Sequence, residues 1–385
     1  MGEANGTSNP EKEAVIQQLA TAMGGISPVQ ELYPFLCVVV FVFGLFLGSF
    51  FNVCIYRIPL GLSVNSPRRS FCFRCGSQIR WHDNIPVLSY LLLRGKCRQC
   101  GAGFSPRYMA VELLTAIVFL AVFMGTNPPG SETLQAATLW YLAFAGLLIV
   151  GTFTDLDHWI IPDGVTVGGA IAALVLSVPI GLLDQFPLLI QFGPFPIVRE
   201  YWDADLYTMM LALSDGPKAL DLPAEAHRWW DAPANAAIGA AFGFSLLYSI
   251  GVIGKVLFRK DAMGFGDVKL FAMIGAAMGI LGSLLTLFLA CLFGVVGGAV
   301  GMILSAVREN PSSVLQEAPA LLEVTEGSSS GDPSPAVSRI EEIARSAPRP
   351  RSVHHLPFGP WIALAAIVVL IFHQPLQRFV SQWIF

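Results

Sequence analysis

Residues 35–55 read FLCVVVFVFGLFLGSFFNVCI, an apolar run without a single charged side chain. A helix needs about 20 such residues to cross the roughly 30 Å hydrocarbon layer of a bilayer. The rest of the chain has the same character, because 54% of its 385 residues are hydrophobic and only 13% are charged. Its mean hydropathy of +0.61 is higher than one soluble core requires. The composition therefore indicates an integral membrane protein.

Further apolar runs predict an all-α integral membrane protein with about eight transmembrane helices. Residues 270–307 carry no charge but are too long for one crossing, so Gly279 and Gly282 are expected to divide them into two spans. The other predicted spans lie at residues 108–125, 134–153, 164–183, 232–254 and 360–372. The predicted units are a polar tail (1–33), a first helix (34–56) and a cysteine-containing segment (57–107). A transmembrane domain (108–307), a loop (308–355) and a last helix (356–385) follow.

The charges of the loops predict how the chain is oriented in the membrane. Lys and Arg are retained on the cytoplasmic side of short connections. Residues 57–107 hold nine of them against the single acid Asp83, so this segment is predicted to be cytoplasmic. Counting spans forward then places the acidic insertion 184–232 outside and residues 308–355 inside. The latter are rich in Ser, Pro and Glu, a composition typical of a disordered loop.

Four cysteines in the basic segment form two C-x-x-C pairs, Cys72 with Cys75 and Cys97 with Cys100, separated by 21 residues. This spacing is typical of a structural zinc site in which four thiolates close a tetrahedral shell. Gly76 and Gly101 would accommodate the tight turns. Disulfides or unliganded thiols are the alternative, which a reducing cytoplasm disfavours. The sequence therefore predicts a small cytoplasmic loop domain that binds zinc through four cysteines.

Acidic residues gather at two predicted helix ends. Asp155, Asp157, His158 and Asp163 follow the third span, and Asp267 begins the sixth within Gly264-Phe-Gly266-Asp267-Val-Lys269. Two helices separate these places, so both return to one membrane face. Ionisable groups near hydrocarbon usually mark a functional site. Two carboxylates that meet share a proton, so one can act as base and the other as acid. Solvated helix caps are the alternative, with Asp163 suited to a helix N-terminus.

These motifs together resemble the type IV prepilin peptidases, the bacterial leader peptidase and N-methyltransferase family. The resemblance covers most of residues 44–183 and 232–305 with a short C-terminal piece. Besides the cysteines and acids it rests on Gly48-Ser49-Phe50-Phe51-Asn52-Val53, Arg57-Ile-Pro59, Asn84-Ile-Pro86, Ser89-Tyr90-Leu91, Gly95-Lys96-Cys97, Val111-Glu112-Leu113 and Pro357-Phe-Gly359-Pro360.

The resemblance implies a GxGD-type aspartyl endopeptidase in the bacterial inner membrane. Such enzymes cleave the leader of type IV prepilins or type II secretion pseudopilins after glycine, at the cytoplasmic face. Family members with the full cysteine loop usually also methylate the new N-terminus with S-adenosylmethionine. This second activity is implied by resemblance alone, since no glycine-rich cofactor loop is visible. The catalytic pair maps to Asp155 and Asp267, with supporting roles for Asp157, His158, Asp163, Gly264, Gly266 and Lys269.

Other functions compete with this one. A peptidase without methyltransferase activity would keep the dyad alone. A proton or cation transporter would use Asp155, Glu112 and Asp267 as an ion relay, but it predicts polar residues along the middle of several spans. A membrane scaffold would use the zinc module to bind partners. The expected partners are prepilins or pseudopilins in the membrane, and no nucleic-acid partner is expected.

Overall fold

Apolar helices form nearly all of the computed structural model, which describes residues 28–65, 70–72, 74–129, 134, 137–183, 231–259, 263–308 and 358–372. The described helices are α2 (Pro28–Arg57), η1 (Trp81–Asn84), α3 (Leu88–Leu92), α4 (Arg107–Thr126), α5 (Ala137–His158), α6 (Asp163–Leu183), α9 (Asp231–Phe258), α10 (Phe265–Arg308) and α13 (Gly359–Ile371). In this part of the chain the β structure is limited to two isolated bridges. The prediction of an all-α fold is confirmed.

Five helices are long and apolar enough to cross a membrane, namely α2, α4, α5, α9 and α10. The apolar parts of α6 and α13 are shorter, at Asp163–Val178 and Gly359–Ile371. The protein is therefore a multi-pass membrane protein, whereas the number of eight crossings stays a prediction. The insertion 184–232 and the loop 308–355 lie almost wholly outside the described residues, as does the tail up to residue 27.

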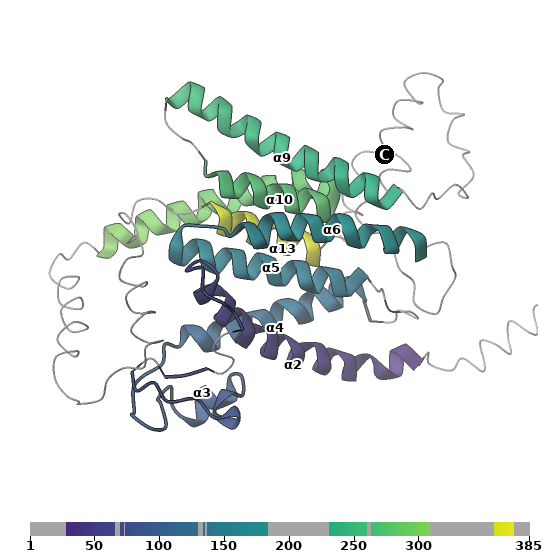
Figure 1. The fold of residues 1–385 in the computed structure, drawn as a ribbon. Coiled ribbons are helices and arrows are strands. Elements are labelled where there is room, and N and C mark those ends of the chain that lie inside the picture. The colour runs from purple at the N-terminus through teal and green to yellow at the C-terminus, as the bar shows by residue number, and fades with distance from the viewer. Residues whose placement is uncertain are drawn as a thin grey trace, which may run out of the picture.

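The helices pack side by side as a bundle (Figure 1). Helices α2 and α4 form one side of it, α9 and α10 the other, and α5, α6 and α13 lie between them. The core is made of fully buried side chains of α5, α10 and α13, including Phe144, Leu148, Phe271, Met273 and Ile362. The cysteine-containing segment projects beyond the ends of α2 and α4 (Figure 1).

Glycines let neighbouring helices approach each other closely at two interfaces. A Cβ on Gly239 of α9 would collide with the carbonyl oxygen of Gly275 in α10, and a Cβ on Gly275 would collide with that of Gly239. In α2, Cβ atoms on Gly44 and Gly48 would lie 2.6 Å and 2.7 Å from the Cα atoms of two α4 residues. Small residues four apart are a common way to pack helices in a membrane, where close van der Waals contact drives association.

Helix α10 reverses direction at Gly279, whose φ of 69° and ψ of −170° lie outside the helical region. Both ends of α10 consequently lie at the same end of the bundle (Figure 1). The contacts agree, because Gly294 faces Phe358, the residue before Gly359, while Asp267 near the start of α10 faces Gly359 itself. A glycine is suited to this bend because it has no Cβ that would clash with the backbone at a positive φ. The expected division of residues 270–307 thus has a structural basis at Gly279.

Two helices extend further than their apolar runs. Helix α2 starts at Pro28, before the predicted start at residue 34, where proline and Glu31 suit a helix N-terminus. Helix α5 continues to His158, beyond the predicted end at residue 153. It ends where Trp159 takes a φ of 56°. Asp155 therefore lies in the last turn of a helix, because a helical backbone can continue past the hydrocarbon.

Candidate active site

Two buried aspartates lie where α5 ends and α10 begins. Asp155 is 7% exposed and Asp267 is 9% exposed, which is low for carboxylates. The amide of Trp159 donates to the carbonyl oxygen of Asp155 at 2.9 Å and closes the last turn of α5. The amide of Asp267 donates to the carbonyl oxygen of Gly264 at 3.1 Å and opens the first turn of α10. Both carboxylates are thus placed by regular helix ends.

The two carboxylates meet at the start of α13. A Cβ built on Gly359 would lie 2.6 Å from Oδ2 of Asp155 and 3.2 Å from Oδ1 of Asp267. Both side chains therefore point to one place beside Gly359, close enough to interact electrostatically. The same Cβ would lie 3.1 Å from Cδ1 of Ile161, which forms an apolar wall. The sequence brought Asp155 and Asp267 to one face, and the structure brings them to one point.

An ion pair stands beside each of the two aspartates. Nη2 of Arg107 lies 2.5 Å from Oδ2 of Asp157, two residues after Asp155. Nζ of Lys269, two residues after Asp267, lies 2.6 Å from Oδ1 of Asp163. Asp157, Asp163 and Lys269 therefore join helix ends to one another.

The other predicted supporting residues differ in their placement. A Cβ on Gly264 would lie 3.6 Å from Oδ2 of Asp267, so this glycine borders the second carboxylate. Gly266 instead faces Ile161, with its Cβ position 3.6 Å from the Cβ of that residue. His158 is the partly exposed last residue of α5. Among the described residues it makes no hydrogen bond with Asp155 or Asp267 through its side chain.

The arrangement provides paired carboxylates in a dry setting. Two carboxylates that point to the same place oppose joint ionisation, so such a pair can share one proton. An ionised carboxylate can accept a proton from water, and a protonated one can donate to a carbonyl oxygen. Gly359 leaves the space between them free of side chains. This geometry suits hydrolysis of an amide that reaches the dyad from the end of the bundle.

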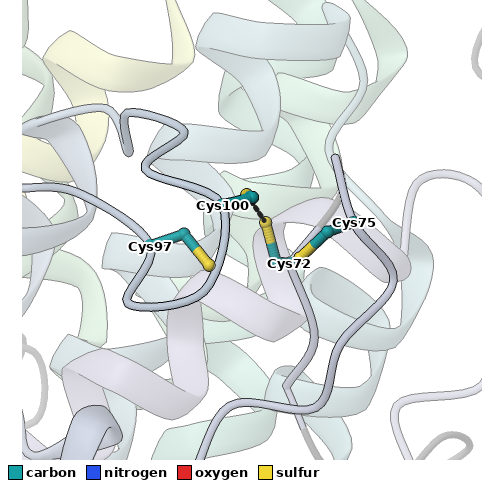
Figure 2. A group of neighbouring side chains, drawn as sticks. All are labelled: Cys72, Cys75, Cys97 and Cys100. Atoms are coloured by element: carbon teal, nitrogen blue, oxygen red, sulfur yellow. Dashed lines mark hydrogen bonds between the residues drawn. The ribbon is translucent and has the colours of Figure 1, made fainter. Parts of the chain in front are cut away.

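The four cysteines converge from two loops (Figure 2). Their Sγ atoms all lie within 4.8 Å of one another, and those of Cys72 and Cys100 are 3.7 Å apart. Each loop has the same hydrogen bonds: the amide of Gly76 donates to the carbonyl oxygen of Cys72, and the amide of Gly101 to that of Cys97. Both glycines have positive φ, at 67° and 71°. The predicted tight turns are confirmed.

The thiols differ in how readily they ionise. A hydrogen bond with the Ser77 hydroxyl lowers the pKa of the Cys75 thiol to about 6. Backbone amides of Cys100 and Gln99 lower the pKa of the Cys97 thiol. Burial raises the pKa of the Cys72 thiol to about 12. A cation bound by these four sulfurs would compensate the charge of the buried Cys72 thiolate.

Sequence reasoning missed two residues of this site. Gly359 was recognised only as part of a C-terminal motif, without a role at the dyad. Arg107 was counted only as one of the basic residues that indicate orientation. Nothing in the local sequence of either residue pointed to Asp155 or Asp157, because the contacts join helices that are far apart in the chain.

Comparisons with known proteins agree with this geometry. Residues 42–126 match the bacterial peptidase A24 N-terminal domain. Residues 220–299, which include Asp267, match the type IV leader peptidase family. A prepilin leader peptidase/N-methyltransferase of Myxococcus xanthus is 32% identical over 90% of this chain and 92% of its own length. The chain belongs to the type IV leader peptidase family. The resemblance seen in the motifs is confirmed.

Further relatives of this leader peptidase family have similar names. A prepilin leader peptidase/N-methyltransferase of Pseudomonas aeruginosa is 28% identical over 87% of this chain and 90% of its own length. A type 4 prepilin-like proteins leader peptide-processing enzyme of Escherichia coli is 32% identical over 61% of this chain and 74% of its own length. No solved structure matches the chain significantly. Asp155 lies outside both ranges matched by the family models.

Gly359→Ala is expected to separate the two carboxylates. The added methyl group would lie 2.6 Å from Asp155 Oδ2, too close for an unshifted structure. A displacement of about 1 Å at a reacting group can lower the rate by about 100-fold. Peptidase activity in detergent should fall by about that factor while the protein still folds. Gly298→Ala is the matched control, because a Cβ there meets nothing within 4 Å. Equal activity of the two variants would contradict a dyad formed at Gly359.

Proposed function

We propose that this protein cleaves the leader peptide of type IV prepilins or type II secretion pseudopilins, with Asp155 and Asp267 as the catalytic pair. The observation that carries the proposal is that both buried carboxylates face the same side-chain-free position at Gly359. The names of the Myxococcus and Pseudomonas relatives supply the substrate class. The cut is expected to follow a glycine, as the family resemblance implies.

The cleavage would take place at the cytoplasmic face of the bacterial inner membrane. The Arg107–Asp157 ion pair joins the start of α4 to the end of α5, and the carboxylates around Gly359 join the end of α5 to the start of α10. Arg107 ends the basic segment that begins at residue 57, and such segments are retained in the cytoplasm. The dyad therefore lies level with the side that the charge bias makes cytoplasmic.

Hydrolysis would use the two carboxylates in opposite protonation states. The ionised one takes a proton from a water molecule, whose oxygen attacks the carbonyl carbon of the scissile peptide. The protonated one donates to the carbonyl oxygen as it gains negative charge. The carboxylate that took the water proton then gives it to the leaving nitrogen, and the carbon–nitrogen bond breaks. As the tetrahedral intermediate collapses, its hydroxyl returns a proton to the other carboxylate, so the pair again holds one proton. Because each carboxylate has a distinct task, neither residue can do without the other.

Asp155→Asn and Asp267→Asn should each abolish cleavage of a prepilin-like peptide by the purified protein in detergent. General acid–base catalysis typically contributes about 100- to 10,000-fold, so each variant should lose at least the lower figure. Neither variant should lower the thermal midpoint, because each substitution removes repulsion between two buried carboxylates. Cleavage that survives in either variant would refute the aspartyl mechanism. A transporter that uses the same acids would show no cleavage even in the wild-type protein.

We further propose that Cys72, Cys75, Cys97 and Cys100 hold one structural zinc ion. Four sulfurs about 2.3 Å from a tetrahedral zinc lie about 3.8 Å apart, close to the 3.7 Å between Cys72 and Cys100. A complete shell of thiolates leaves no coordination position for a reacting water. The ion would link the two cysteine loops to each other. The chain provides the four thiolates and the turns that orient them.

Metal analysis of the reduced protein should find about one zinc ion per chain. Changing Cys72 and Cys97 to serine should remove it, because each loop then loses a ligand. Changing Cys291 to serine is the control, since this exposed cysteine lies on α10, outside the four-cysteine cluster. Zinc-free wild-type protein would overturn the metal site without bearing on the dyad.

A second activity, N-methylation by S-adenosylmethionine, is supported by a cavity of about 230 Å³ between α2, α4 and the cysteine-containing segment. Aromatic side chains line it, among them Tyr56, Phe104 and Tyr108, and suit an adenine ring and a sulfonium cation. Glu112 also lines it, is 8% exposed and accepts the Val87 amide at 2.7 Å. The bound donor would supply the methyl group.

Donor binding can be measured separately from either reaction. Equilibrium dialysis with labelled S-adenosylmethionine should show binding to the wild-type protein and at least about tenfold weaker binding to Glu112→Gln, because the charge facing the cation is lost. Asp155→Asn should bind the donor normally, since Asp155 does not line the cavity. No binding by the wild-type protein would favour a peptidase without methyltransferase activity.

A further inference from the structure

Arg107 is the first residue of α4, where the cysteine-containing segment meets the helix bundle. Its guanidinium contacts Asp157 at 2.5 Å, and its Cζ lies 5.4 Å from the centre of the Phe153 ring. Phe153 and Asp157 are four residues apart on α5 and so share one face of that helix. Asp155 lies halfway between them in sequence and so points to another side of the helix. Arg107 therefore holds the last turn of α5 from a face that does not carry the dyad carboxylate.

The charges of this pair occur at unfavourable helix ends. Arg107 is at the N-terminus of α4, where the helix dipole disfavours a cation, and Asp157 is at the C-terminus of α5, where it disfavours an anion. Each charge alone would destabilise its helix end. Together they neutralise each other across the interface. The pairing therefore offsets an unfavourable interaction between charge and dipole in each helix.

Asp267, the other aspartate of the dyad, also has an ion pair and a cation–ring contact beside it. Lys269 pairs with Asp163 of α6, and its Nζ lies 5.1 Å from the centre of the Phe265 ring, four residues earlier on α10. Each aspartate of the dyad is therefore followed, two residues later, by a charged residue paired with another helix. In each case a cation lies beside an aromatic ring on the helix that bears the aspartate. Both helix ends that carry the dyad are fixed in rotation in the same way.

Arg107 is itself firmly placed by the N-terminal part of the chain. Its amide donates to the Ser105 hydroxyl oxygen at 3.3 Å, and Asn52 of α2 donates to the carbonyl oxygen of Tyr108 at 3.0 Å. The start of α4 is thus tied to α2 and to the loop that follows Cys100. A shift of this segment would be transmitted to α5 through the ion pair.

We infer that Arg107 is a positioning residue for the peptidase site, whose ion pair with Asp157 sets the rotation of the last turn of α5 and so aims Asp155 at Asp267. This inference rests on the proposed function of the dyad. It assigns the N-terminal part of the protein a role in cleavage, although that part contributes no side chain to the dyad.

The test compares Arg107→Ala, Asp157→Ala, Arg107→Lys and the exchange Arg107→Asp with Asp157→Arg. The two alanine variants should lower kcat by about tenfold to 100-fold, with KM within about twofold, since a misaimed carboxylate slows the reaction without altering substrate binding. Arg107→Lys should keep part of the activity. The exchange should recover most of it, because both charges then lie at favourable helix ends and still attract each other.

Two measurements separate positioning from a loss of folding. Zinc content and thermal midpoint should be unchanged in Arg107→Lys and in the exchanged pair. Amide hydrogen exchange of residues 153–158 should speed up in Arg107→Ala and return toward wild type in the exchanged pair. Tyr33→Phe is the control, because it removes a 2.9 Å hydrogen bond to Asn127 at the opposite end of α4. It should leave cleavage and exchange of residues 153–158 unchanged.

The outcomes distinguish this inference from the proposed function. Wild-type cleavage that requires Asp155 but is unaffected by Arg107→Ala would reject the positioning role and leave the peptidase intact. An exchanged pair no more active than the single variants would also reject it. If the wild-type protein cleaved nothing, the proposed function would fail, and unchanged hydrogen exchange of residues 153–158 in Arg107→Ala would reject the inference independently.

Discussion

The packing of this protein must hold together two buried carboxylates that repel each other. Asp155 and Asp267 come from different helices, and each loses hydration as the helices pack. Such a pair persists only where the surrounding backbone leaves no freedom to move apart. Gly359 closes the position from a third helix without adding a side chain. The end of α5 and the starts of α10 and α13 must therefore meet within a small volume. The rest of the packing holds these three helix ends in place.

The rest of the bundle fixes those ends from a distance. Close glycine contacts let α9 pack tightly against α10 and α2 against α4. The reversal at Gly279 brings the second half of α10 back to α13, where Gly294 faces Phe358. Ion pairs join the helix ends beside the dyad. The membrane alone would keep the helices roughly perpendicular to its plane. It would not determine the rotation of each helix about its axis or its depth.

Much of this arrangement could be predicted from the sequence, for identifiable reasons. Apolar runs predicted the helices because spanning a bilayer is a local requirement of length and composition. The cysteine turns were predictable because ligand spacing is local, and the pairing of Asp155 with Asp267 followed from counting spans. Contacts such as Arg107 with Asp157 could not be predicted, since they depend on helix rotation. The end of α5 was misjudged because an amphipathic turn can extend beyond an apolar run.

The position of Gly359 after both aspartates in the chain has a consequence for biosynthesis. Helices α5 and α10 are made long before α13, so both aspartates enter the membrane without the helix that closes their site. A growing chain would therefore carry an incomplete dyad, open on one side, until α13 leaves the ribosome. The enzyme would therefore acquire its activity only in a late step of its own assembly, when α13 packs beside α5 and α10.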